Sequence, residues 1–304
     1  MCRGQTTPLA DATAGGTWKS VSTGVATINA SGVVTGVTAG TSIIRYTVTN
    51  GNGCTDSVAT TVTVNALPVI AAITGTTIVC VGQTTPLADA TAGGTWKSVS
   101  TGVATINASG VVTGVTAGTS IIRYTVTNGN GCTDSVATTV TVNALPVIAP
   151  ITGTTSVCAS STTQLADATA SGVWTSTNTS VATINSTGLV SGISAGTSII
   201  RYTVTNGNGC TDSVATTVTV NALPIVAPIT GNTINAVTDV ITLSSTTSGG
   251  VWTSSNTAIA TVSASGVVTG VSTGTVTISY TVTNGSGCVT TVTYIITINP
   301  KANG

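Results

Sequence analysis

One tryptophan-containing segment recurs four times at a constant spacing of 78 residues. Its tryptophans are Trp18, Trp96, Trp174 and Trp252. Residues 4–71 recur without a change as residues 82–149, whereas the third and fourth copies differ progressively. A repeat of this length is too long for a solenoid unit but long enough to bury a small core of its own. The sequence therefore predicts four tandem domains, at residues 1–67, 68–145, 146–223 and 224–304.

β-Branched residues dominate the composition and favour strands over helices. The chain has 41% hydrophobic residues, no phenylalanine and only 5% charged residues. Seven basic residues balance seven acidic ones, so no net field would attract nucleic acid or an anionic membrane surface. We predict an all-β protein with no nucleic-acid partner and no membrane insertion.

The first repeat shows the two-residue period of strands that bury one face. Apolar and polar residues alternate over residues 44–49 and again over residues 58–64. Shorter candidate strands surround Trp18 and cover residues 26–28 and 33–37. Turn signals rich in Gly and Asn separate these runs at residues 15–16, 30–32 and 50–53. The pattern predicts a two-sheet antiparallel sandwich with one central tryptophan anchoring the core of each domain.

A short proline-containing segment joins consecutive repeats. Asn65-Ala-Leu-Pro68 recurs at residues 143–146 and 221–224, and a strand such as residues 151–157 opens the next repeat. Proline fixes φ and removes a backbone donor, so it restrains bending more than a Gly/Ser tether would. We expect the four domains to form a semi-rigid, extended rod.

Three segments of the fourth repeat carry a family resemblance, and all four repeats share their pattern. They are residues 252–262, 265–271 and 274–280. The chain resembles the bacterial immunoglobulin-like (Ig-like) domain of group 2, which implies an Ig-like β-sandwich and no particular activity. The cysteine pair and the Asn-Gly-Asn-Gly-Cys loop are similar to surface-protein arrays of Bacteroidetes-type bacteria. This second resemblance implies an extracellular or cell-surface protein with a role in adhesion, in a stalk or in a fibre.

Six of the seven cysteines form three pairs with a separation of 52 residues in the same register of each repeat. The pairs are Cys2 with Cys54, Cys80 with Cys132, and Cys158 with Cys210. We predict three intradomain disulfides, each stabilising its domain by roughly 4 kcal/mol in the chain-entropy model. Disulfides imply an oxidising, extracytoplasmic compartment. The alternative is a set of buried free thiols in a cytosolic protein.

Cys288 breaks this pattern, because the residue 78 positions after Cys158 is Ala236. We predict that Cys288 is an unpaired thiol. Two interpretations stay open: a buried thiol whose partner has been replaced, and a covalent link to another chain.

The first repeat also differs from the others at its start. The segment that precedes the first cysteine of the second repeat, residues 73–79, has no counterpart before Cys2. We expect domain 1 to lack its first strand and to expose a sheet edge that can accept a strand from a neighbour. Head-to-tail self-assembly is the hypothesis that follows.

The residues that most enzymes and metal sites need are missing. The sequence has no histidine and no glutamate, and its seven acidic residues are all aspartates. Catalytic triads need an imidazole, and glycosidases need two carboxylates across one site. Asp11 and Asp56 could meet in principle, but turn positions with solvated side chains are the expected roles. Nothing clusters as calcium or zinc ligands do. We predict no enzyme activity, no catalytic residue, no cofactor and no metal.

Two surface features suggest contacts with carbohydrate or ice. Asp-Ser-Val segments at Ser57, Ser135 and Ser213 are similar to an O-glycosylation acceptor of Bacteroidetes-type bacteria, with an ordinary turn as the alternative. Outward threonines such as Thr61 and Thr63 could match an ice lattice or stack against a glycan. Threonine is also simply a favoured residue on exposed strands.

The sequence therefore favours a non-enzymatic extracellular spacer, stalk or filament subunit. The alternative is an adhesin segment that binds a surface glycan, or ice, through a Thr-rich sheet face. A module appended to a large enzyme is a third possibility.

Overall fold

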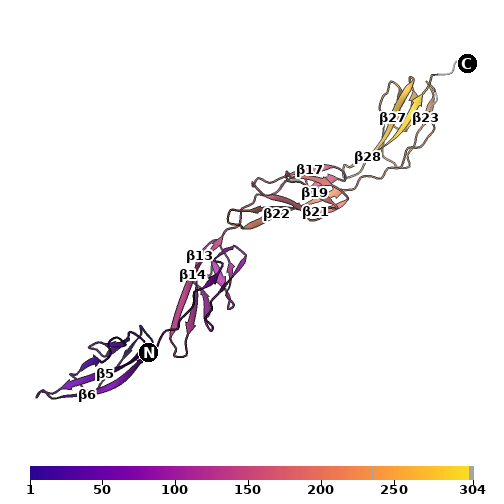
Figure 1. Ribbon diagram of the computed structural model, residues 1–304. Helices are drawn as coiled ribbons and strands as arrows, with labels where there is room; N and C mark the ends of the chain where they lie inside the picture. The colour runs from indigo at the N-terminus through magenta and orange to yellow at the C-terminus, as the bar shows by residue number, and fades with distance from the viewer. Residues whose placement is uncertain (234–235, 301–304) are drawn as a thin grey trace. The chain divides into compact units, whose positions relative to one another are not determined.

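The computed structural model describes residues 1–233 and 236–300. All regular secondary structure in these residues is β-strand, as Figure 1 shows. The chain divides into two compact units, Met1–Leu145 and Pro146–Gly304. We keep the names domain 1 to domain 4 for the four predicted ranges; residues 234–235 and 301–304 of domain 4 lie outside the described residues. No described helix is long and apolar enough to cross a membrane.

Domain 2 contains two four-stranded sheets. Their strand orders are β10-β13-β14-β8 and β11-β12-β9-β7. Neighbouring strands are antiparallel, except that β8 runs parallel to β14. The strands of domain 2 are β7 Thr74–Gly75, β8 Ile78–Cys80, β9 Thr84–Ala88, β10 Thr95–Ser98, β11 Ala104–Ile106, β12 Val111–Gly114, β13 Gly118–Thr127 and β14 Thr133–Asn143.

Domain 3 repeats both sheets of domain 2, with orders β15-β17-β20-β19 and β16-β22-β21-β18. Its strands are β15 Thr152–Gly153, β16 Ser156–Cys158, β17 Thr162–Ala166, β18 Val173–Ser176, β19 Ala182–Ile184, β20 Leu189–Gly192, β21 Gly196–Thr205 and β22 Thr211–Asn221.

Domains 1 and 4 each contain two three-stranded sheets. Domain 1 has orders β1-β4-β3 and β2-β5-β6, and domain 4 has orders β23-β26-β25 and β24-β27-β28. The strands of domain 1 are β1 Thr6–Pro8, β2 Thr17–Ser20, β3 Ala26–Ile28, β4 Val33–Gly36, β5 Gly40–Thr49 and β6 Thr55–Val64. Those of domain 4 are β23 Val240–Thr242, β24 Val251–Ser254, β25 Ala260–Val262, β26 Val267–Gly270, β27 Gly274–Thr283 and β28 Val289–Ile298.

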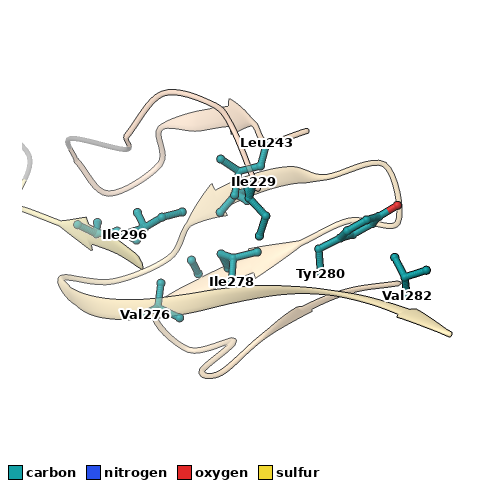
Figure 2. Packing of buried hydrophobic residues seen from close by; sticks show 10 residues of the cluster. Ile229, Leu243, Val276, Ile278, Tyr280, Val282 and Ile296 are labelled. Carbon is teal, nitrogen blue, oxygen red and sulfur yellow. The ribbon is translucent and has the colours of Figure 1, made fainter. Parts of the chain in front are cut away.

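The core of each domain lies between its two sheets. In domain 4, Ile278 and Ile296 are fully buried and pack with Leu243 and Ile229 (Figure 2). Equivalent clusters fill the other three domains. The predicted all-β fold of tandem antiparallel sandwiches is confirmed. The domain bounds and the rod stay predictions.

The tryptophans do not lie at the centres of these cores, which corrects one detail of the prediction. Trp18, Trp96, Trp174 and Trp252 are only half-buried and pack against the edge of each cluster. Each packs against the tyrosine that faces it on the neighbouring strand, with ring centroids 4.6 Å apart and ring planes tilted by 43–47°. Fully buried β-branched and leucine side chains fill the centre instead.

The strand predicted at residues 151–157 is two short strands in different sheets. β15 pairs with β17, and β16 pairs in parallel with β22. The change of sheet takes place after Gly153, whose φ is +117°, a value that other residues rarely adopt. A Cβ at Gly153 would also lie 2.3 Å from the carbonyl oxygen of Gln164.

The start of domain 1 carries only the last part of the strand that β8 forms in domain 2. Cys2 makes an isolated parallel bridge with Asn65, as Cys80 does with Asn143 inside β8 and β14. Around it, the amino group of Met1 donates to Thr63 O, and the Asn65 N–H donates to Met1 O. The edge predicted to be vacant is therefore partly paired by the chain's own first residues.

Candidate functional site: the disulfide joints

The disulfides join consecutive domains rather than closing single domains. Cys2 bonds Cys132 and Cys158 bonds Cys288, each with a sequence separation of 130 residues. Cys80 and Cys210 are also disulfide-bonded, and Cys54 is a free, exposed thiol.

The predicted disulfides within single domains, Cys2–Cys54, Cys80–Cys132 and Cys158–Cys210, are therefore wrong. Cys288, predicted to be unpaired, is bonded to Cys158.

Strand length explains why a disulfide within one domain cannot form. Cys2 bridges Asn65, just after the end of β6, whereas Cys54 lies at the hairpin tip just before β6 begins. Eleven extended residues at about 3.3 Å each separate the two ends by about 35 Å. A disulfide needs its Cα atoms within about 7 Å, and the Cα–Cα distance of Cys2–Cys132 is 5.5 Å.

The disulfide pairing can be tested by cleavage before aspartate, because every resulting peptide holds at most one cysteine. Without reduction, we expect peptide 1–10 to be linked to 89–133, and peptide 134–166 to be linked to 239–304. Peptide 11–55 should carry an alkylated Cys54. Mass spectrometry that found peptide 1–10 linked to 11–55 would contradict these joints.

The second cysteine of each joint lies in an Asn-Gly-X-Gly-Cys loop, where X is Asn130 in domain 2 and Ser286 in domain 4. Asn128 Oδ1 accepts hydrogen bonds from the backbone N–H groups of Asn130 and Cys132. This turn leaves Asn128 Nδ2 free to donate to Ala66 O in the linker, at 2.9 Å. In domain 4 the same amide, Nδ2 of Asn284, donates to Ala222 O at 2.8 Å. The loop asparagine therefore hydrogen-bonds the preceding linker close to the disulfide.

The linker contacts a site that we call the socket. In domain 2 it consists of Thr91, Val126, Cys132 and Val136, the counterparts of four residues that line one hollow in domain 1. The far end of the linker is fixed where the Ala71 N–H donates to Thr91 Oγ1 at 2.8 Å. Val126 is 7% exposed and Cys132 is fully buried.

The socket of domain 4 is filled in the same way. The Ala227 N–H donates to Thr247 Oγ1 at 2.9 Å, and Val226 packs against the core cluster of that domain. In these two joints the linker thus becomes part of the domain that follows it.

In domain 1 the same face is uncovered. Val58, at the position of Val136, is 59% exposed, and Cys54 and Thr13 are exposed as well. A hollow of about 370 Å³ lies there, lined by Asp11, Thr13, Tyr46, Val48, Asn50, Cys54, Thr55, Asp56, Ser57 and Val58. The alternation predicted a buried Val58, but in domain 1 no described linker covers this side chain.

Asp11 and Asp56 both line this hollow, and each accepts a hydrogen bond from a nearby backbone N–H. Asp11 Oδ1 accepts from the Thr13 N–H, and Asp56 Oδ1 accepts from the Ser57 N–H, both at 2.8 Å. No three His, Cys, Asp or Glu side chains gather as a metal site within the described residues. Asp11 therefore has the turn role that the sequence suggests, whereas the same prediction is wrong for Asp56, which lies within β6.

The serines of the Asp-Ser-Val segments are half-buried and contact an arginine of the neighbouring strand. Arg45 Nη1 donates to Ser57 Oγ at 3.2 Å, and Arg201 Nη1 donates to Ser213 Oγ at 2.8 Å. The equivalent contact to Ser135 is longer, at 3.5 Å. O-Glycosylation of Ser57, Ser135 and Ser213 stays a prediction, and a sugar there would have to displace the arginine.

Covering the socket leaves one polar atom without a partner. Asp89 Oδ2 in domain 2 is buried and accepts no hydrogen bond. Domain 4 has Ser245 at this position, and its hydroxyl donates to Ala227 O in the linker at 3.1 Å.

We expect Asp89→Ser to raise the free energy of unfolding of domain 2 by about 1–2 kcal/mol, because it removes a buried unpaired oxygen. Denaturant titration measures this change. Asp11→Ser in the open socket of domain 1 is the matched control, with an expected change within about 0.5 kcal/mol. Equal effects at both sites would show that covering by the linker is not the cause.

The fold and the joints define a tandem β-sandwich protein in which disulfides link domain 1 to domain 2 and domain 3 to domain 4. The bacterial Ig-like domain (group 2) family matches residues 136–218 and 214–292, which together make up more than half of the chain. The chain belongs to this family.

Among curated proteins, the chain is similar to Ice-binding protein 1 of Shewanella frigidimarina (strain NCIMB 400). The two are 32% identical over 294 residues, which cover 86% of this chain and 32% of that protein. The chain thus spans about a third of the length of the curated relative that it matches.

Two solved structures show a fainter likeness. Invasin, a bacterial integrin-binding protein, matches at 15% identity over 93% of this chain and 71% of that chain, with a TM-score of 0.32. Domains 1–6 of the surface layer protein SbsC match at 17% identity over 91% of this chain and 48% of that chain, with a TM-score of 0.22. Both scores are too low to support an argument about function.

Proposed function

We propose that this chain is a non-enzymatic spacer segment of an extracellular or cell-surface protein. The observation that carries the proposal is the joint: a linker seated in the socket of the next domain, a hydrogen bond from the loop asparagine, and a disulfide beside both. A flexible tether between binding modules would need none of these contacts. Disulfides also favour an oxidising compartment outside the cytoplasm.

The joint predicts that oxidation controls the freedom of neighbouring domains. Small-angle scattering of the full chain should give a narrow distribution of interatomic distances when oxidised and a broader one after reduction. Circular dichroism on the same samples checks that the sandwiches stay folded. Identical distributions in the two states would contradict the spacer function. Antibody labelling of intact cells of the producing organism tests the location separately.

Strand addition at domain 1 remains a prediction, and the geometry limits what it could contribute. In domain 2 the strand β8 pairs with only three residues of β14, Thr141–Asn143. The equivalent edge of domain 1 already binds the chain's own first residues. An incoming strand would gain few backbone hydrogen bonds there, so the spacer function does not depend on it.

A second candidate function, binding of ice or a glycan, has support in the outer face of domain 4. Its β27–β28 hairpin carries hydroxyl pairs: Thr275 with Thr297 at 3.3 Å, and Thr281 with Thr291 at 2.9 Å. Ser279 and Thr293 face each other between them. In domains 1 to 3 an arginine interrupts this row, at Arg45, Arg123 and Arg201. The relative named Ice-binding protein 1 makes ice the first ligand to test.

The natural difference between the domains supplies the matched variant. Ser279→Arg restores the residue of the other three domains, so the fold should be kept. If domain 4 binds ice, this substitution should abolish inhibition of ice recrystallisation by the full chain. Inactive wild-type protein, or full activity of the variant, would count against ice binding, and a glycan array with the same pair tests carbohydrate.

A further inference from the structure

The free cysteine of domain 1 lies in a site that is occupied in other domains. Cys54 occupies the position of Cys132 and Cys288, and both of those bond a cysteine of the preceding domain. Its loop is already formed: Asn50 Oδ1 accepts from the N–H groups of Asn52 and Cys54, each at 3.0 Å. The loop that carries Cys54 thus has the same backbone hydrogen bonds as the loops that carry Cys132 and Cys288.

The groove beside Cys54 matches the segment that fills it elsewhere. In domain 2, Val136 is half-buried and lines one hollow together with the linker residues Ala66–Ile70. In domain 1, Val58 at the same position is 59% exposed. The Thr13 hydroxyl stands where Thr91 accepts from Ala71, and Asn50 stands where Asn128 donates to Ala66. An apolar surface and two linker-binding polar groups are therefore uncovered together.

We propose that the socket of domain 1 binds the C-terminal end of another Ig-like domain of this kind, and that Cys54 forms a disulfide with the first cysteine of that domain. The occupant is an Asn-Ala-Leu-Pro type linker beside a reduced cysteine. The inference rests on the socket and not on the spacer function, so the two can fail separately.

A second, unaltered copy of the chain cannot supply this partner. Its three cysteines of the first type, Cys2, Cys80 and Cys158, are all disulfide-bonded. In domain 4 the residue at that position is Ala236. It forms a parallel bridge with Asn299, equivalent to the bridge between Cys2 and Asn65. The partner is therefore a domain outside this chain.

The bond forms by thiol–disulfide exchange with a small disulfide such as oxidised glutathione. The Cys54 thiolate attacks one glutathione sulfur and releases one glutathione thiolate, giving a mixed disulfide. The thiolate of the partner cysteine then attacks the Cys54 sulfur and releases the second glutathione thiolate. Two cysteine thiols are oxidised to one disulfide, and one glutathione disulfide is reduced to two thiols.

The test adds to domain 4 the two features that a partner needs: a cysteine of the first type and an Asn-Ala-Leu-Pro type linker. In the donor-end variant, Ala236→Cys is combined with replacement of residues 300–304 by Ala-Leu-Pro-Ile-Val-Ala, the linker sequence of residues 222–227. In glutathione buffer we expect a ladder of disulfide-linked oligomers on a non-reducing gel. Cleavage before aspartate should then link peptide 11–55 to peptide 212–238, which contains the new cysteine.

Three controls make the result decisive. Adding Cys54→Ser should abolish the ladder. Adding Val58→Arg should slow ladder formation at least tenfold and leave glutathionylation of Cys54 unchanged, because it blocks the groove and spares the thiol. Ala236→Cys alone, with the native C-terminus, should form the same link more slowly and serves as a second donor if the new tail disturbs folding.

The native Cys2–Cys132 and Cys158–Cys288 links in the same digest show that the variants are folded. Folded donor variants in which Cys54 bonds only glutathione or another Cys54 would overturn the proposal. A ladder that Val58→Arg does not slow would also overturn it, since the bond would then need no socket.

Discussion

Replacing Cys2 and Cys132 by serine is expected to lower the free energy of unfolding of the residues they enclose by about 5 kcal/mol. The disulfide closes a loop of 130 residues, and in the chain-entropy model the stabilisation grows slowly with loop length to about this value. The loss would be a large share of the total stability of small domains. Guanidinium titrations of the wild type and the double variant measure the change.

Cys54→Ser is the matched control for this prediction. Cys54 is exposed and free, so its replacement should change the free energy of unfolding by less than about 0.5 kcal/mol. If the double variant unfolded at the same denaturant concentration as this control, the joint would contribute nothing to stability. A lower slope of the transition would instead indicate that the two domains had begun to unfold separately.

The second large effect is expected in the core of domain 2. Ile122 on β13 is fully buried between the sheets, so Ile122→Ala should cost about 2–5 kcal/mol through lost burial and a residual cavity. The neighbouring Ile121 points outward and is 44% exposed. Ile121→Ala, an identical change one residue away, should therefore cost much less. Calorimetry of the full chain should show one unfolding transition moved to lower temperature for Ile122→Ala. Comparable shifts for both variants would contradict the assignment of Ile122 to the buried face and Ile121 to the exposed face of β13.

Local patterns along the sequence predicted most of the fold. The alternation over residues 44–49 corresponds to the buried and exposed faces of β5, and the Asn-Gly segment at residues 50–53 forms the turn between β5 and β6. These features depend on residues close together in the chain, so the sequence carries them directly. The change of sheet at Gly153 was missed because a backbone conformation with positive φ leaves no mark on the apolar pattern.

The disulfide pairing was not predictable from the same reasoning, for a reason specific to repeats. A separation of 52 residues within a domain and one of 130 residues between neighbours differ by one repeat of 78 residues, so both keep the same register. Only the length of β6 distinguishes them, because it places Cys2 and Cys54 at opposite ends of one strand. The socket was missed for a related reason: identical sequences, such as those around Val58 and Val136, differ in exposure when only one has a linker beside it.

The position of the first disulfide also determines how tension would travel through the protein. When tension is applied between Met1 and residue 133, it passes through Cys2 and its bond to Cys132, so residues 3–131 lie outside the covalent line of force. Fully extended, those residues would span on the order of 400 Å. Unfolding of both sandwiches would not release this length, because the disulfide still holds Cys2 next to Cys132. Residues 3–131 can extend under this load only after the sulfur–sulfur bond has been reduced.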